Sequence, residues 1–268
     1  MRVEDFLRGS VLPRLEAEVL TSAALGQDRS WLLAHGDTEV SSSERTAIQS
    51  HFRRRTLGEP VAYITGTKEF YGRTFHVSPA VLIPRPSTEQ LVDLALRFLS
   101  HPQQESLEAD TQIVVSSLIL RSSLVPSVVV DVGTGSGCIA VTMALEASKY
   151  CYIATDASEQ ALDVARSNAK RHGVDQKMTF RFGNDLEPIR DLAEPFVVVT
   201  NPPYIPLGEK LPREVADFEP SGALFADDAG MAVLKRVLRQ ANQHPFCAGI
   251  VFECRTEQYS ALLQTGSK

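Results

Sequence analysis

The chain has 268 residues, of which 43% are hydrophobic, so it can form one large domain together with a small one. Its net charge of -6 argues against nucleic acid as a partner, because a phosphate backbone requires clustered Lys and Arg. No run approaches the roughly 18 apolar residues of a membrane-spanning helix, and the six histidines lack the spacing of a metal site. We therefore expect neither a membrane span nor a bound metal.

The first 57 residues predict a small helical domain. Ile48 and Phe52 lie four residues apart, the spacing that places two side chains on one face of a helix. Ser41 stands three residues before Glu44, which is typical of a helix start. We assign residues 1–57 to an N-terminal helical domain that would help to bind a substrate.

The next segments predict a linker and the start of a larger domain. Residues 58–83 carry β-type side chains with two glycines as breaks, which favours a β-hairpin that links two domains. The larger domain then covers residues 84–268. Between residues 103 and 127 a polar, acidic stretch leads to the apolar run 113–120, whose pattern fits a helix and a strand equally well.

A glycine-rich loop joins a predicted strand to a predicted helix in the middle of the chain. The β-branched run 128–132 precedes the loop, and a helical pattern over residues 138–146 follows it. Glycines permit a tight turn and let a ligand approach the main chain closely. The spacing G-x-G-x-G after Asp131 differs from that of a dinucleotide site. The candidate cofactor-binding residues of this loop are Gly133, Thr134, Gly135, Ser136 and Gly137.

Two further predicted strands end in polar side chains. Residues 150–155 form the second strand and bring Asp156 to its carboxyl end, about 20 positions beyond the glycine loop, where a carboxylate can bind ribose hydroxyls. Residues 178–182 form the third strand, which is followed by Asn184 and Asp185. Because ligands bind at the carboxyl ends of such strands, these three side chains are candidate cofactor contacts.

The fourth predicted strand ends at Asn201-Pro202-Pro203-Tyr204, the most informative motif of the chain. The apolar run 195–200 precedes it, and the prolines cannot continue a sheet because they lack an N–H. The Asn201 amide oxygen and the Pro202 carbonyl can each accept one hydrogen of a planar NH2 group, and the Tyr204 ring can cover its plane. We therefore take Asn201, Pro202 and Tyr204 as catalytic candidates, Pro203 as a further substrate contact, and Asn201 as an additional cofactor contact.

Together these motifs resemble the S-adenosylmethionine-dependent methyltransferases that modify planar nitrogens. Four further segments narrow the resemblance to the HemK/PrmC family, the release factor glutamine methyltransferases; they are residues 58–66, 69–72, 82–89 and 217–220. The resemblance spans residues 1 to about 260. It implies an α/β fold in which a Rossmann-like class I methyltransferase domain, with a doubly wound and mostly parallel sheet, accompanies a small N-terminal helical domain.

The resemblance also implies the cofactor and the reaction. The cofactor would be S-adenosylmethionine, with Asn184 or Asp185 meeting its adenine. The substrate would be the glutamine of the Gly-Gly-Gln motif in class I peptide chain release factors, methylated on its side-chain amide nitrogen. We expect a monomer in the cytoplasm, or in the mitochondrial matrix if the chain is an organellar homologue. Its first residues are partly acidic and lack a long apolar core, which favours neither a secretory signal nor a transit peptide.

The family resemblance is incomplete after the fifth predicted strand, residues 249–253, which follows a helix over residues 230–241. Family members ordinarily continue with an antiparallel strand pair that completes a seven-stranded sheet. We predict that this chain lacks that C-terminal strand pair. We therefore expect the edge of the fifth strand to be exposed, which is unfavourable for folding and promotes association.

Two other functions are compatible with the motifs. An N6-adenine methyltransferase of DNA or RNA shares Asn-Pro-Pro-Tyr because adenine also presents a planar NH2 group, although such an enzyme must flip the base out and neutralise phosphates. A non-catalytic truncated homologue would keep the fold only as a binding module. The identity of the methylated molecule distinguishes an adenine methyltransferase from a release factor methyltransferase. Measured affinity for the cofactor distinguishes a non-catalytic homologue from an enzyme.

Overall fold

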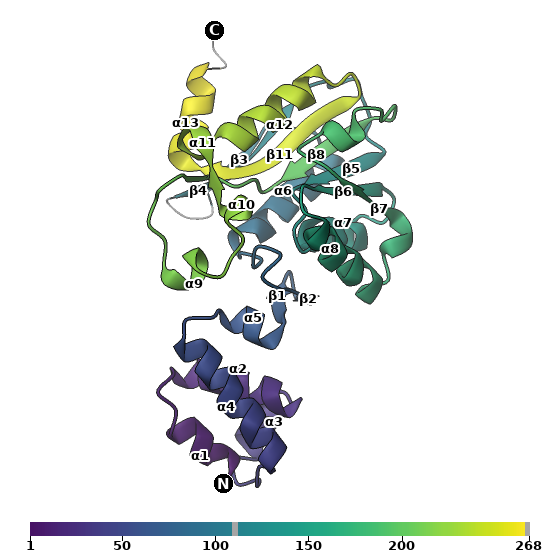
Figure 1. Cartoon of the computed structure of the whole chain (residues 1–268). Helices are drawn as coiled ribbons and strands as arrows, with labels where there is room; N and C mark the ends of the chain where they lie inside the picture. The colour runs from purple at the N-terminus through teal and green to yellow at the C-terminus, as the bar shows by residue number, and fades with distance from the viewer. Residues whose placement is uncertain (109–111, 266–268) are drawn as a thin grey trace. The chain divides into compact units, whose positions relative to one another are not determined.

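The computed structural model describes residues 1–108 and 112–265 (Figure 1). The chain divides into two compact units. Unit 1 comprises Met1–Thr67 and Leu211–Phe218, and unit 2 comprises Lys68–Lys210 and Glu219–Lys268. Residues 58–83, predicted to be a linker, therefore contribute to both units.

Unit 1 is built from short helices around a small apolar core. The helices are α1 (Val3–Arg8), α2 (Arg14–Leu25), α3 (Arg29–Ala34), α4 (Ser42–Thr56), α5 (Val61–Thr65) and α9 (Arg213–Ala216). The buried members of this core cluster are Val3, Phe6, Leu7, Ala17, Leu32, Val40 and Ile48. The Ser41 hydroxyl accepts from Glu44 N at 3.3 Å, and the Glu44 carboxylate accepts from Ser41 N at 2.8 Å. This reciprocal cap confirms the predicted helix start.

The segment predicted to be a hairpin is partly helical. The hairpin itself is limited to β1 (Thr67–Phe70) and β2 (Arg73–His76), and α5 precedes it. Pro60 stands at the start of α5, and Gly66, with φ of 72°, ends it. These local signals outweigh the β propensity of the side chains between them, so the prediction of β structure is wrong for α5.

A seven-stranded sheet forms the centre of unit 2, in the order β3-β4-β11-β8-β5-β6-β7. The strands are β3 (Ser106–Glu108), β4 (Ile113–Ile119), β5 (Val128–Val132), β6 (Cys151–Asp156), β7 (Met178–Phe182), β8 (Phe196–Thr200) and β11 (Cys247–Arg255). The strands β11, β8, β5, β6 and β7 run parallel to one another. This arrangement confirms the predicted Rossmann-like, mostly parallel sheet.

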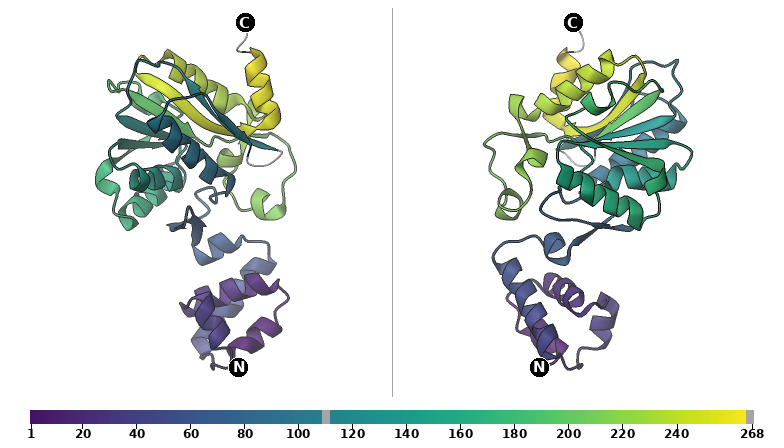
Figure 2. Two further views of the ribbon diagram at one scale, coloured as in Figure 1. Left: turned by 180° about the vertical axis from the view of Figure 1, so that it is seen from behind. Right: turned by 45° about the vertical axis from the view of Figure 1, so that its right-hand side comes forward.

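Helices cover both faces of this sheet (Figure 2). One face packs against α6 (Ser87–Ser100), α7 (Cys138–Glu146) and α8 (Glu159–Arg171), and the other packs against α12 (Ala232–Gln243) and α13 (Thr256–Thr265). Along β5, Val129 belongs to the first core while Val128 and Val130 belong to the second, as the alternation of a strand requires. Within residues 1–108 and 112–265, no helix is long and apolar enough to cross a bilayer.

The edge of β11 is covered, so the expectation of an exposed fifth strand is wrong. The ambiguous apolar run is the strand β4, which pairs antiparallel with β11 from Ile113 opposite Arg255 to Ile119 opposite Gly249. β3 then pairs antiparallel with β4. In the described part of the chain, α13 follows β11 and no further strand does. β4 and β3 thus form an antiparallel pair beside β11, and β4 pairs with the main chain of β11 from Gly249 to Arg255.

The remaining short elements of unit 2 lie in its loops. They are the 3-10 helices η1 (Asp175–Lys177) and η2 (Glu187–Ile189), the strands β9 (Ile205–Pro206) and β10 (Phe225–Ala226), and the helices α10 (Ser221–Leu224) and α11 (Asp227–Gly230). β9 directly follows the Asn-Pro-Pro-Tyr motif and pairs with β10 in a small parallel sheet. This pairing holds the chain that leaves the motif close to the chain that leads into α12.

Candidate active site

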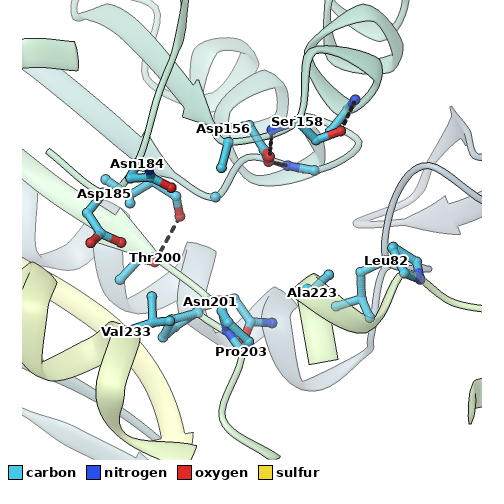
Figure 3. Close-up of a pocket in the computed structure, with 18 of the residues that line it drawn as sticks. Leu82, Asp156, Ser158, Asn184, Asp185, Thr200, Asn201, Pro203, Ala223 and Val233 are labelled. Carbon is cyan, nitrogen blue, oxygen red and sulfur yellow. Dashed lines mark hydrogen bonds between the residues drawn. The ribbon is translucent and has the colours of Figure 1, made fainter. Parts of the chain in front are cut away.

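A cavity of about 380 Å³ opens at the carboxyl ends of β5, β6, β7 and β8 (Figure 3). Its volume is typical of a small-molecule site, and its position is where an open α/β sheet binds ligands. The sequence-predicted residues that line it are Gly133, Gly135, Asp156, Asn184, Asp185, Asn201, Pro202 and Pro203. The predicted strand ends therefore meet at one place, as the parallel topology requires.

The glycine loop leaves open space beside its main chain. Gly133 and Gly135 have φ of 70° and 53°, and a Cβ built on either would meet nothing within 4 Å. Conformation rather than crowding therefore favours glycine at these two positions. At Gly137 a Cβ would come within 3.0 Å of the Ala165 Cβ, so close packing against α8 also matters there. The predicted loop residues that do not line the cavity are Thr134, Ser136 and Gly137.

Two carboxylates, the half-buried Asp156 and the fully buried Asp131, support the glycine loop and the strand ends beside it. Asp156, at the end of β6, accepts from Gly135 N and Ser158 N, both at 2.9 Å. Burial raises its pKa, and these main-chain hydrogen bonds oppose the rise. Asp131 lies beneath the loop with 0% exposure and accepts from Thr134 Oγ1 at 2.7 Å. Burial raises the pKa of Asp131 to about 7.

Asn184 and Asp185 differ in what they can offer a ligand. The Asp185 carboxylate accepts from Arg236 Nε at 2.7 Å and is only 7% exposed, so its charge is already compensated. Asn184 is exposed at the cavity wall. Arg236, on α12, also lines the cavity. Sequence reasoning did not identify Arg236, because nothing local to α12 signals a partner 51 positions earlier.

The Asn-Pro-Pro-Tyr motif leaves β8 with its asparagine fixed by a hydrogen bond. Asn201 Nδ2 donates to Thr88 Oγ1 at 2.9 Å. Asn201, Pro202 and Pro203 line the cavity, whereas Tyr204 does not belong to the lining. The Tyr204 hydroxyl donates instead to Glu253 Oε1 at 3.2 Å. Burial, followed by the nearby Glu253 charge, raises the pKa of Tyr204.

A buried glutamate on β11 connects these side chains. Glu253 is 0% exposed, and its Oε2 accepts from Thr88 Oγ1 at 3.1 Å. Burial raises its pKa to about 7, against the opposing effect of its hydrogen bonds with Thr88, Tyr204 and other hydroxyl and amide groups. Sequence reasoning missed both Thr88 and Glu253. The available signal was a single acidic residue inside an otherwise apolar strand, which is unusual unless the acid has partners.

The residues at the cavity fit the cofactor that the family resemblance predicts. The open glycine main chain and the Asp156 carboxylate suit a ribose, and the Asn184 amide can accept from an adenine amino group. No group of three or more His, Cys, Asp or Glu side chains in the described residues is arranged to hold a metal ion. The main-chain and side-chain groups at this cavity can meet the hydroxyls and the amino group of a nucleoside.

Two family models match this chain, and so do proteins named release factor glutamine methyltransferase. The PrmC N-terminal domain family matches residues 2–66, and the methyltransferase small domain family matches residues 103–216. The release factor glutamine methyltransferase of Koribacter versatilis is 39% identical over 234 residues, which are 87% of this chain and 75% of that protein. That of Bordetella pertussis is 37% identical and covers 88% of this chain and 78% of its own length. Among solved structures, the hMettl16 catalytic domain in complex with a MAT2A 3'UTR hairpin is 15% identical with a TM-score of 0.45, covering 72% of this chain and 63% of that one.

Proposed function

The chain belongs to the release factor glutamine methyltransferase family, and from this premise we propose that it methylates the Gly-Gly-Gln glutamine of class I peptide chain release factors. The methyl group comes from S-adenosylmethionine and is transferred to the side-chain amide nitrogen. The observation that supports this most strongly is the placement of Asn201 and Pro202 at the wall of a nucleoside-sized cavity, with the Asn201 Nδ2 directed to Thr88.

The cofactor half of the site is the edge formed by the ends of β5, β6 and β7. We propose that Asp156 accepts from the ribose hydroxyls and that the main chain of Gly133 and Gly135 contacts the cofactor closely. Asn184 then accepts from the adenine amino group, since Asp185 already pairs with Arg236. Thr134, Ser136 and Gly137 maintain the shape of the loop from positions outside the cavity lining.

The acceptor half is the Asn-Pro-Pro-Tyr motif. An amide nitrogen is a poor nucleophile because its lone pair is delocalised into the carbonyl group. The Asn201 Oδ1 and the Pro202 carbonyl would each accept one N–H of the glutamine amide and so hold the nitrogen in line with the methyl group. Orientation of this kind can contribute on the order of 7–11 kcal/mol in favourable cases. Pro203 would contact the substrate, and Tyr204 would fix the motif through Glu253.

The partner and setting follow from the same assignment. We propose that residues 1–57 form a domain that helps to bind the release factor, that residues 58–83 are the linker, and that residues 84–268 form the methyltransferase domain. The net charge of -6 supports a protein substrate rather than a nucleic acid. We further propose that the protein acts as a monomer in the cytoplasm.

The experiment is methyl transfer from tritiated S-adenosylmethionine to three acceptors. These are a class I release factor, the same factor with its Gly-Gly-Gln glutamine replaced by alanine, and plasmid DNA. We expect label only in the intact release factor. Label in DNA instead would show an adenine methyltransferase. Calorimetric binding of the cofactor without label in any acceptor would contradict the proposal and favour a binding module.

A further inference from the structure

Asn201, Thr88, Ser87, Tyr204 and Glu253 are joined by hydrogen bonds and form the Asn201 network. Among the residues that the structure describes, Glu253 is the only member of this network that carries a formal charge. The residues that face it come from two elements: Ser87 and Thr88 from α6, and Tyr204 and Asn201 from the loop after β8. Across the sheet it lies opposite Val115 of β4, which is apolar. Among the residues that the structure describes, no Lys, Arg or His forms an ion pair with Glu253.

The other charged groups near Glu253 form ion pairs with other partners, and the neighbouring thiol is neutral. Arg85, two residues before the first residue of α6, pairs with Glu219, and Arg255, two residues after Glu253, pairs with Glu209. Burial raises the pKa of the Cys254 thiol to about 12, so it stays neutral near neutral pH. The carboxylate therefore depends on hydroxyl donors and the Asn201 amide for stabilisation, which is a costly arrangement for a charge unless it has a role.

The direction of each hydrogen bond in the network follows from the ionised carboxylate. A carboxylate can only accept, so Thr88 must donate its single hydroxyl hydrogen to Glu253 Oε2. The Thr88 oxygen is then left only as an acceptor, and the Asn201 group that meets it must be the NH2. The Asn201 oxygen is consequently placed on the opposite side of its amide from Thr88.

We propose that Glu253 is a positioning residue whose ionised carboxylate, acting through Thr88, fixes Asn201 in the orientation that accepts from the substrate NH2 group. The inference rests on the proposed function, because that orientation matters only for an acceptor that presents N–H hydrogens. A protonated Glu253 donates to Thr88, which frees the Thr88 hydrogen for Asn201 Oδ1. The Asn201 amide then turns over and presents its own NH2 group to the substrate NH2 group, which cannot accept from it.

The consequence is an acidic limb in the pH profile of turnover. Burial places the pKa of Glu253 at about 7, so the active, ionised form is lost as the pH falls below neutrality. The substrate amide does not titrate in this range. The rate is measured as kcat at saturating S-adenosylmethionine, so that titration of the cofactor amine does not enter the profile.

The first test compares Thr88→Val with Thr88→Ser on the release factor. Valine has nearly the shape of threonine but neither donates nor accepts, so we expect kcat to fall roughly a hundredfold, as for the loss of one aligned hydrogen bond at a reacting centre. Serine keeps the hydroxyl and restores most of the rate. Cofactor affinity, measured by calorimetry, stays within about twofold for both. Equal rates for the two variants would overturn the proposal.

The second test compares Glu253→Gln with a matched control, Glu219→Gln. Both glutamates are buried in unit 2, but Glu219 accepts from Ile83 N and Arg85 and has no bond to the Asn201 network. We expect Glu253→Gln to remove the acidic limb of kcat and Glu219→Gln to retain it. An unchanged acidic limb in folded Glu253→Gln would contradict the positioning role.

A readout that does not depend on activity separates this inference from the proposed function. The nitrogen-15 NMR signals of the Asn201 side-chain amide are followed through a pH titration that brackets neutrality. We expect them to shift with the titration of Glu253 in the wild-type protein and to lose that shift in Thr88→Val. Signals insensitive to both changes would overturn the inference. If the wild-type protein fails to methylate release factor, the proposed function fails, while these signals still decide the positioning role.

Discussion

The two halves of the candidate site are held in different ways. In the cofactor half, Asp156 is fixed by main-chain N–H groups of Gly135 and Ser158. In the acceptor half, Asn201 is fixed by the side chain of Thr88, which is fixed in turn by Glu253. A group held by the main chain keeps its place when neighbouring side chains change. A group held by side chains depends on every partner and on where each proton lies.

The largest effect is expected from removal of Asn201. Asn201→Ala should lower kcat roughly a hundredfold, because a positioning hydrogen bond in a closed site is worth on the order of 3 kcal/mol in the transition state. Cofactor affinity should fall much less, since Asp156 and the glycine loop are untouched. Rapid-quench methylation of release factor and calorimetry with S-adenosylmethionine measure the two quantities.

Asn201→Asp is the matched comparison for Asn201→Ala. A carboxylate still accepts a hydrogen bond, but it places a negative charge beside the cofactor sulfonium and also stabilises the ground state. We expect partial activity, above that of Asn201→Ala. Normal turnover in Asn201→Ala would mean that the motif only ends β8, and the separation of the site into two halves would fail.

The cofactor half is tested by Asp156→Ala. Loss of a charged acceptor for two hydroxyls should weaken S-adenosylmethionine binding by about tenfold to a hundredfold, in line with about 1.5–3 kcal/mol for hydrogen bonds to a charged group. Asp156→Asn should be milder because the amide retains one acceptor oxygen. Circular dichroism confirms the fold of each variant, and unchanged affinity in a folded Asp156→Ala protein would remove Asp156 from the cofactor site.

A smaller effect is expected at the adenine end. Asn184→Ala should weaken cofactor binding by about fivefold, the value of one neutral hydrogen bond of about 1 kcal/mol. The measurement is competition between adenosine and inosine analogues of S-adenosylhomocysteine, since an inosine ring lacks the amino group. Wild-type protein should prefer the adenosine analogue and Asn184→Ala should not. Retention of that preference would assign the adenine to Asp185 instead.

A separate effect, on stability rather than on rate or cofactor binding, concerns the free energy of unfolding as the pH changes. Burial raises the pKa of Asp131 from 3.8 and that of Glu253 from 4.5, each to about 7. Between the ordinary value and the raised one, the folded state keeps a proton that the unfolded state has lost, so these two groups make the free energy of unfolding fall as the pH rises. Above about pH 7 their contribution levels off.

Urea unfolding at a series of pH values checks this slope. Below neutral pH, Asp131→Asn and Glu253→Gln should each reduce the fall of the free energy of unfolding with rising pH, relative to wild type. Asp131 belongs to the cofactor half of the site and Glu253 to the acceptor half. The paired carboxylates Glu18 and Glu59, whose pKa values arginine partners lower, act in the opposite direction but at lower pH. A slope that neither variant changes would show that both acids titrate normally in the folded protein.

Sequence alone predicted the features that depend on neighbours along the chain. An apolar run leads directly to a polar residue at Asp156 and at Asn201, so their place at the carboxyl ends of strands could be deduced from local patterns. Sequence did not predict the helix at residues 61–65, because its side chains are of the type that favours strands. The helix is only five residues long, and its side chains Tyr63 and Ile64 are buried. Propensity is a weak guide when burial decides the outcome.

The features that sequence did not predict depend on distant partners. β4 pairs with β11 across more than a hundred residues, so its apolar run could not be distinguished from a helix until its neighbour was known. Thr88 and Glu253 are 165 positions apart, and neither has a local pattern that announces the other. The long separation between β4 and β11 along the chain also explains why the edge of β11 was predicted to be exposed although β4 covers it.

The most direct test of the account is to locate the methyl group. Release factor is incubated with S-adenosylmethionine and either the wild-type protein or Asn201→Ala, digested, and sequenced by mass spectrometry. The account predicts one added methyl group on the glutamine of Gly-Gly-Gln with the wild-type protein and almost none with Asn201→Ala over the same time. Methylation of any other residue, or equal modification by both proteins, would contradict it.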